Sequence, residues 1–283
     1  MSKTILLTFI LSSIFFGLKA QNTEWQTTLE DGFRLGVEEN KNVLVEFGVI
    51  QDGTPLFIED EVWSDEVIIN RLSSFIPVSI DMTDQLELTL KYNIVFAPTL
   101  MLFTPKGDVV FKTEGFVDAF QLDNILETLE TNVRKICQLK TVFKDDDALG
   151  NLLILEEYMK GYMKAPKVMK NDFLSFAEST FETLEENKSS LDPVQKQRLR
   201  IFELLLEQMD FPSEAGIRKM YKIGQKELKA SNHSLLLFAI SFAEYKDGDE
   251  KRSRAVYEEL KKRLGTDKQA ADYSMLLETT FDF

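Results

Sequence analysis

The sequence predicts an α/β domain, with a mixed sheet flanked by helices, followed by an all-α domain. Between residues 21 and 135, apolar β-branched runs alternate with helical patterns, whereas from residue 136 onward the periodicity is helical throughout. The charge changes at the same place, with a net charge of −13 for residues 21–135 and −3 for residues 136–283. Because the chain has 283 residues and is 44% hydrophobic, it is long enough for two packed domains. We therefore predict a boundary between residues 135 and 136.

The N-terminal segment has the pattern of a secretory signal peptide. Lys3 precedes an apolar run from Ile5 to Leu18, and the small residue Ala20 follows. The alternative, an uncleaved anchor, is less consistent with so short and interrupted a run. We expect residues 1–20 to be removed, which predicts an exported protein, periplasmic or extracellular, without a stable membrane span.

The first domain begins with a predicted helix, in which Trp25, Leu29, Phe33 and Val37 recur at four-residue intervals. The segment Asp52–Pro55 follows the first strand. Asp and Thr are favoured at helix N-caps and Pro is favoured in the first helical turn, so we predict that a helix starts in this segment. The whole order is helix, strand, helices, strand, helix, two strands and helix, which gives two parallel strands followed by an antiparallel hairpin. The predicted strands are 43–47, 76–80, 99–103 and 109–112, and the later helices are 56–62, 64–74, 86–92 and 120–129.

The second domain consists of helical segments that are separated by Pro and Gly. Their lengths and short connections are typical of antiparallel helix pairs. Residues 236–242 and 255–260 resemble a tetratricopeptide helix hairpin, but the full repeat signature is absent, so a general helical packing domain is the simpler interpretation. Such a domain binds other proteins or docks onto its neighbour. The predicted helices are 148–163, 167–187, 193–210, 213–229, 233–246, 249–264 and 267–280.

Four local features lie at the spacing of a known family. Trp25 precedes the strand Val43–Phe47, Glu46 lies within that strand, the segment Glu61–Val67 follows, and Phe96-Ala97-Pro98-Thr99 precedes the next strand pair. Over about residues 23–132 the chain resembles the thioredoxin-like superfamily, in particular exported thioredoxin-like domains. The resemblance implies a thioredoxin fold, a buried acid at Glu46 and a cis-proline loop at Pro98.

The chain departs from this family at the active site. Where the family has its Cys-x-x-Cys motif, this sequence has Asp52-Gly53-Thr54-Pro55. Disulfide exchange requires a thiolate that attacks and a second thiol that resolves the mixed disulfide, and neither Asp52 nor Pro55 supplies one. We interpret Asp52 as a helix N-cap, with an acid-base or ligand role as the alternative. Thiol-disulfide oxidoreductase chemistry is therefore predicted to be lost.

Two other positions are candidates for a role. In the family, the cis-proline loop pairs its backbone with an extended peptide, so Ala97, Pro98 and Thr99 are candidate peptide-binding residues, or simply part of the fold. Glu46 is either a buried acid of raised pKa or a hydrogen-bonded structural group. We expect no cofactor.

The composition excludes several other kinds of site. The chain has one Cys, Cys137, and one His, His233, so a disulfide within the chain and a Cys/His metal site are impossible. We expect Cys137 to be buried, with a disulfide between two chains as the alternative, and His233 to lie at a helix start. The run Asp145–Asp147 lacks the ligand spacing of a calcium loop. A net charge of −14 argues against nucleic acid as a partner.

These observations favour a redox-inactive, exported module that binds a polypeptide or protein partner. One alternative is a glutathione-transferase-like enzyme, although Gly48, Val49 and Ile50 stand where such enzymes carry a polar catalytic residue. Another is an acidic scaffold or calcium-buffering protein, suggested by the charge of residues 21–135. The sequence leaves the oligomeric state open.

Overall fold

A computed structural model describes residues 24–51, 54–58, 60–115, 118–144, 146–225 and 228–281. The predicted signal peptide and the positions Asp52, Gly53 and Asp145 lie outside these residues. The α/β part contains α1 (Leu29–Glu39), β1 (Asn42–Gln51), β2 (Thr54–Leu56), α2 (Asp60–Trp63), α3 (Glu66–Leu72), β3 (Phe75–Asp81), α4 (Leu86–Lys91), β4 (Thr99–Phe103), β5 (Val109–Glu114) and α5 (Ala119–Thr128).

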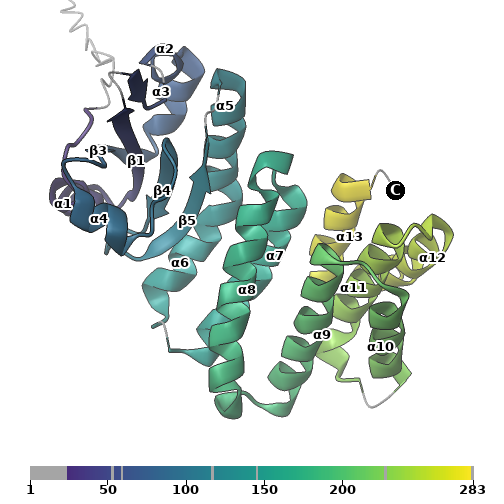
Figure 1. The fold of residues 1–283 in the computed structure, drawn as a ribbon. Helices are drawn as coiled ribbons and strands as arrows, with labels where there is room; N and C mark the ends of the chain where they lie inside the picture. Colours follow the sequence, from purple (N-terminus) through teal and green to yellow (C-terminus); the bar gives the residue numbers. More distant parts are fainter. Residues whose placement is uncertain are drawn as a thin grey trace, which may run out of the picture.

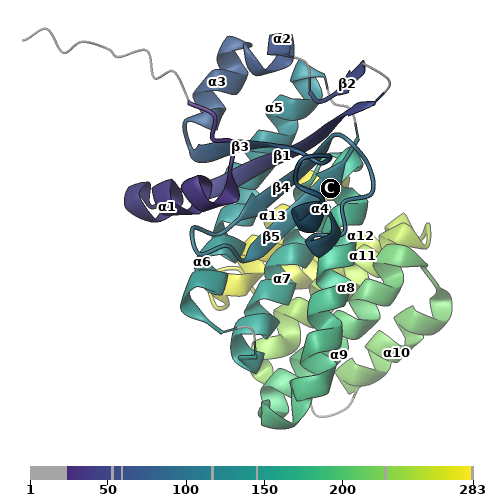
Figure 2. The same cartoon turned by 60° about the vertical axis from the view of Figure 1, so that its left-hand side comes forward.

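The sheet is mixed, and β1 lies at its centre. β1 pairs in parallel with β3 on one side and antiparallel with β4 on the other, and β4 pairs antiparallel with β5. The short strand β2 pairs antiparallel with the last residues of β1, beyond the stretch that β3 covers. Figure 2 shows β1 extending past the rest of the sheet toward β2. The predicted strands are confirmed to within two residues, except that β1 is longer.

Helices cover both faces of this sheet, because the strand side chains alternate between two apolar clusters. Val43, Val45 and Phe47 of β1 lie in the cluster that α1 and α4 cover. Leu44 lies in the other cluster, together with residues of α3 and α5. The predicted fold class is confirmed: a thioredoxin-like α/β sandwich is followed by an all-α part.

Two expectations for the first domain are wrong. The predicted helix 56–62 starts later, because Thr54–Leu56 form β2 and α2 begins at Asp60. The predicted first helix does not contain Trp25, whose neighbour Gln26 instead forms a β-bridge with Val78.

Helix α1 packs on the sheet through Leu29 and Phe33 of the predicted face, together with two glycines. Val37 is 62% exposed, whereas Gly32 and Gly36 are buried against the sheet. A Cβ at Gly32 would lie 2.6 Å from Cγ2 of Val78, so only glycine allows this close approach. The four-residue spacing therefore identifies Leu29 and Phe33 on the buried face of this helix, but not Val37.

The all-α part confirms the predicted order of helices. A continuous helical run leads into it from α5 through a π-helical turn (Leu129–Val133) and α6 (Arg134–Val142), across the predicted boundary at residues 135 and 136. The sequence had not predicted α6. The remaining helices are α7 (Ala148–Lys164), α8 (Lys170–Asn187), α9 (Pro193–Asp210), α10 (Glu214–Gln225), α11 (His233–Lys246), α12 (Glu250–Lys261) and α13 (Lys268–Phe281).

The helical part docks on the β5 side of the sheet. Figure 1 shows α7 and α8 beside β5, with the later helices extending away from it. The ring of Phe111 in β5 lies 4.8 Å from that of Phe173 and 5.7 Å from that of Phe176, and the Tyr158 hydroxyl donates to the Val110 carbonyl at 2.6 Å. One apolar cluster runs through both parts of the molecule. Within the described residues, no helix combines the length and apolarity that crossing a membrane requires.

Candidate functional site

The candidate site lies where β4 begins, beside the carboxyl end of β1. The Ala97–Pro98 peptide bond is cis, as the sequence resemblance implied. Pro98 is buried, and its carbonyl accepts a hydrogen bond from the Gly115 amide at 2.9 Å. The connection between β5 and α5 is thereby held against this loop.

The three predicted peptide-binding residues differ in their access to a ligand. Thr99 is fully buried, pairs with Phe47 of β1, and donates its hydroxyl to the Phe96 carbonyl at 2.6 Å. Ala97 is partly exposed, and no described residue forms a hydrogen bond with its backbone N–H or C=O. Thr99 and Pro98 therefore fix the loop, whereas Ala97 alone offers backbone groups to a partner.

Large apolar side chains are exposed along the chain that surrounds Ala97. Val95 and Phe96 precede it and are 63% and 62% exposed. Phe120, in the first turn of α5 after the connection from Gly115, is 76% exposed. Val95 and Phe96, directly before Ala97, give this loop the exposed apolar surface that is typical of a binding site. The sequence analysis had singled out the loop but had missed Phe120.

The helix before the loop adds two more apolar side chains. Leu86 and Leu90 of α4 are 61% and 72% exposed, and their four-residue spacing places them on one face of the helix. The amide of Ile94 donates to the Thr89 carbonyl at 2.9 Å, which ties the loop to α4. The loop therefore combines backbone groups that have no hydrogen-bond partner among the described residues with the exposed side chains of Val95 and Phe96.

Glu46 lies in β1, two residues before Gly48, and is 3% exposed. Its Oε1 accepts a hydrogen bond from the Ile58 amide at 2.6 Å. Burial raises the pKa of Glu46 to about 7, against the lowering effects of the Ile58 amide and the Trp63 indole. The buried Nε1 of Trp63 nevertheless lacks a partner at normal hydrogen-bond geometry among the described residues. Glu46 is thus a buried acid of raised pKa that is also hydrogen-bonded, so both interpretations of this residue from the sequence apply.

Glu46 and Gly48 together hold the segment that follows β2. A Cβ at Gly48 would lie 2.2 Å from the ring of Phe57, so this ring packs on β1 only because residue 48 is glycine. The ring of Trp63 then meets that of Trp25 edge-on, with their centroids 4.8 Å apart. These contacts fix the chain between the β1–β2 hairpin and α3.

The remaining candidates are structural. Cys137 lies in α6 and is 4% exposed, and burial raises the pKa of its thiol to about 12. His233 is the first residue of α11, which confirms the predicted helix start. Asp147 caps α7 by accepting a hydrogen bond from the Gly150 amide at 2.7 Å. Among the described side chains, no group of three or more His, Cys, Asp or Glu residues is placed to hold a metal ion.

Comparison with known proteins adds no relative: no protein-family model and no curated protein matches this chain.

Proposed function

We propose that this protein is an exported, redox-inactive member of the thioredoxin-like superfamily that binds extended polypeptide segments at the loop around Ala97. The single observation that carries the proposal is the exposed apolar loop before β4, in which the backbone of Ala97 has no hydrogen-bond partner among the described residues. An extended segment that adds its backbone to such a loop gains hydrogen bonds, and the exposed side chains supply apolar contact.

The distribution of thiols supports the absence of redox activity. The family positions for the two cysteines are Asp52 and Pro55, and the chain has one thiol, that of Cys137. This thiol is buried in α6, and its pKa of about 12 keeps it protonated at neutral pH. Since thiol-disulfide exchange needs an accessible thiolate, neither half of the reaction has a group to perform it.

The N-terminal pattern supports the export of the protein. Lys3 followed by an apolar run and a small residue is the pattern of a secretory signal. In the periplasm or outside the cell, a binding module of this kind would meet unfolded or extended polypeptides.

The redox part of the proposal is tested by the reduction of insulin with dithiothreitol. We expect the mature protein to leave the rate of insulin precipitation unchanged from that of dithiothreitol alone. Clear turnover above this background would contradict the loss of redox chemistry.

The binding part is tested with fluorescein-labelled, carboxymethylated insulin B chain, a polypeptide that cannot form disulfides. We expect the double variant Val95→Ser/Phe96→Ser to bind it about tenfold more weakly than the wild type, because apolar anchors dominate such contacts. The matched control, Val142→Ser/Val168→Ser, removes two exposed side chains from α6 and the turn before α8. Equal binding by all three proteins, or no binding by the wild type, would contradict the proposal.

A further inference from the structure

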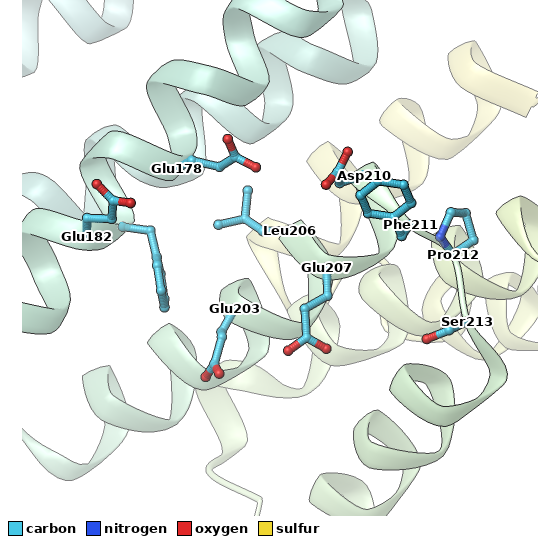
Figure 3. Close-up of a pocket in the computed structure, with 10 residues that line it drawn as sticks. Glu178, Glu182, Glu203, Leu206, Glu207, Asp210, Phe211, Pro212 and Ser213 are labelled. Carbon is cyan, nitrogen blue, oxygen red and sulfur yellow. The ribbon is translucent and has the colours of Figure 1, made fainter.

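The helical part carries a groove of about 630 Å³ between α8 and α9, which ends at the turn into α10. Figure 3 shows acidic side chains from both helices around it, with Phe211 and Pro212 at one end. The groove lies on elements that contribute nothing to the loop around Ala97. It is therefore a separate surface, which the proposed function does not use.

The groove is strongly acidic. Two of its carboxylates form ion pairs: Glu203 pairs with Arg200, and Glu207 lies 3.6 Å from Nζ of Lys219. The other three are Glu178, Glu182 and Asp210, and none of them forms an ion pair with a described residue.

The pKa of Glu178 responds to the negative charge of the groove. Burial raises the pKa of Glu178, and the charges of Asp210 and Glu182 raise it further. A cationic group in the groove would relieve this repulsion, so its charge is complementary to a basic partner.

The groove also has an apolar component that an inorganic cation would leave unused. Phe211 is 77% exposed, although it directly follows the last residue of α9. Phe181 and Leu206 line the space between the helices, and Pro212 extends the apolar end. An exposed aromatic ring beside a row of carboxylates matches a ligand that carries both positive charges and apolar side chains.

We propose that this groove binds a cationic amphipathic polypeptide segment, with Lys or Arg side chains at the carboxylates and an apolar side chain against Phe211. A second copy of this chain is a poor occupant, because each copy has a net charge of −14. The partner is a basic polypeptide, and the site is independent of the one around Ala97.

The test uses a fluorescein-labelled synthetic peptide of Leu-Lys-Lys-Leu repeats, and fluorescence anisotropy measures its binding to the mature protein. The groove variant is Glu178→Gln/Asp210→Asn, and Phe211→Ser removes the exposed ring. The matched charge control, Glu250→Gln/Glu258→Gln, removes the same charge from the exposed surface of α12. Circular dichroism checks that every variant is folded.

We expect both groove variants to weaken binding about tenfold, while the α12 control changes it by less than about twofold. The variant Val95→Ser/Phe96→Ser should bind this peptide as the wild type does, so failure of the loop proposal leaves this result intact. Equal weakening by the groove and α12 variants would show that only net charge attracts the peptide and would overturn the proposal. Absence of binding by the wild type would overturn it as well.

Discussion

Glu46 shows how one buried residue sets the pH dependence of the fold. It lies in the central strand with one hydrogen bond from the Ile58 amide, and no described cation forms an ion pair with its carboxylate. Burial therefore disfavours its charged form, and its pKa in the folded protein is about 7 rather than the ordinary 4.5. Between these two values the folded chain holds a proton that the unfolded chain releases, so the free energy of unfolding falls as the pH rises through this window.

We expect Glu46→Gln to remove this dependence. The wild type should lose about 3 kcal/mol more of its free energy of unfolding than the variant between pH 4.5 and 8. Urea denaturation followed by tryptophan fluorescence measures this difference, because both tryptophans, Trp25 and Trp63, lie on the same side of the sheet as Glu46. Glu87→Gln, an exposed substitution on α4, is the control and should follow the wild type. Identical pH profiles for Glu46→Gln and the wild type would refute this assignment.

At the scale of the elements, a buried ionic network joins three helices of the all-α part. Arg198 of α9 donates to Glu156 of α7 at 2.5 Å and to the Tyr273 hydroxyl of α13 at 2.9 Å. Lys160 Nζ lies 2.9 Å from Glu156. Burial alone would raise the pKa of Glu156, but the charges of Arg198 and Lys160 lower it to about 2. The charges of the network thus compensate one another, and the loss of Arg198 leaves the buried Glu156 with Lys160 as its one counter-charge among the described residues.

We predict that Arg198→Leu lowers the free energy of unfolding by about 3–5 kcal/mol, because Glu156 loses its main counter-charge. Arg200→Leu, two residues along the same helix, is the control and should change it by less than about 0.5 kcal/mol, since its side chain is 45% exposed. Urea denaturation followed by far-ultraviolet circular dichroism distinguishes the two. A loss of similar size in both variants would rule out a special role for the network.

The helices and strands also show which sequence patterns were sufficient to predict secondary structure. The helices from α7 onward and the strands β3, β4 and β5 were predicted, because breakers such as Pro193 and Gly248 and continuous apolar runs define them locally. β2 was missed because Pro55 after Asp52 favours a helix start, whereas pairing with the end of β1 decides the conformation. Asp52-Gly53 between two strands is itself a hairpin signal, and giving it more weight than the proline would have predicted β2.

Only the parts of the candidate site that a continuous stretch of local sequence defines could be predicted. Ala97 and Pro98 were found from the resemblance in their local sequence. Phe120 and the acidic groove were not, because exposure and the meeting of α8 with α9 depend on tertiary packing. The same is true of Arg198, which meets Glu156 across 42 residues of sequence.

At the scale of the whole molecule, the two parts behave as one packed body. The apolar cluster that contains Leu44 of the sheet also contains Phe173 of α8 and Leu277 of α13. The continuous helical run from α5 to α6 also connects the α/β part to the all-α part. A shared core of this kind predicts that neither part unfolds without the other.

We therefore expect a single unfolding transition. Tryptophan fluorescence, which reports only on the α/β part, and far-ultraviolet circular dichroism, which is dominated by the helices, should give the same urea midpoint. Phe173→Ala, which removes a ring from the contact with β5, should lower the free energy of unfolding by about 3–5 kcal/mol by both probes. Two separate transitions in the wild type would show that the parts are independent.

The central claim is that a polypeptide binds through the loop around Ala97. Amide hydrogen exchange with and without carboxymethylated insulin B chain tests it most directly, because pairing protects the amide that takes part. We predict that exchange slows at residues 95–97, with the Ala97 amide included, and stays unchanged along α12. Protection that is confined to the helical part, with no change at residues 95–97, would contradict the account.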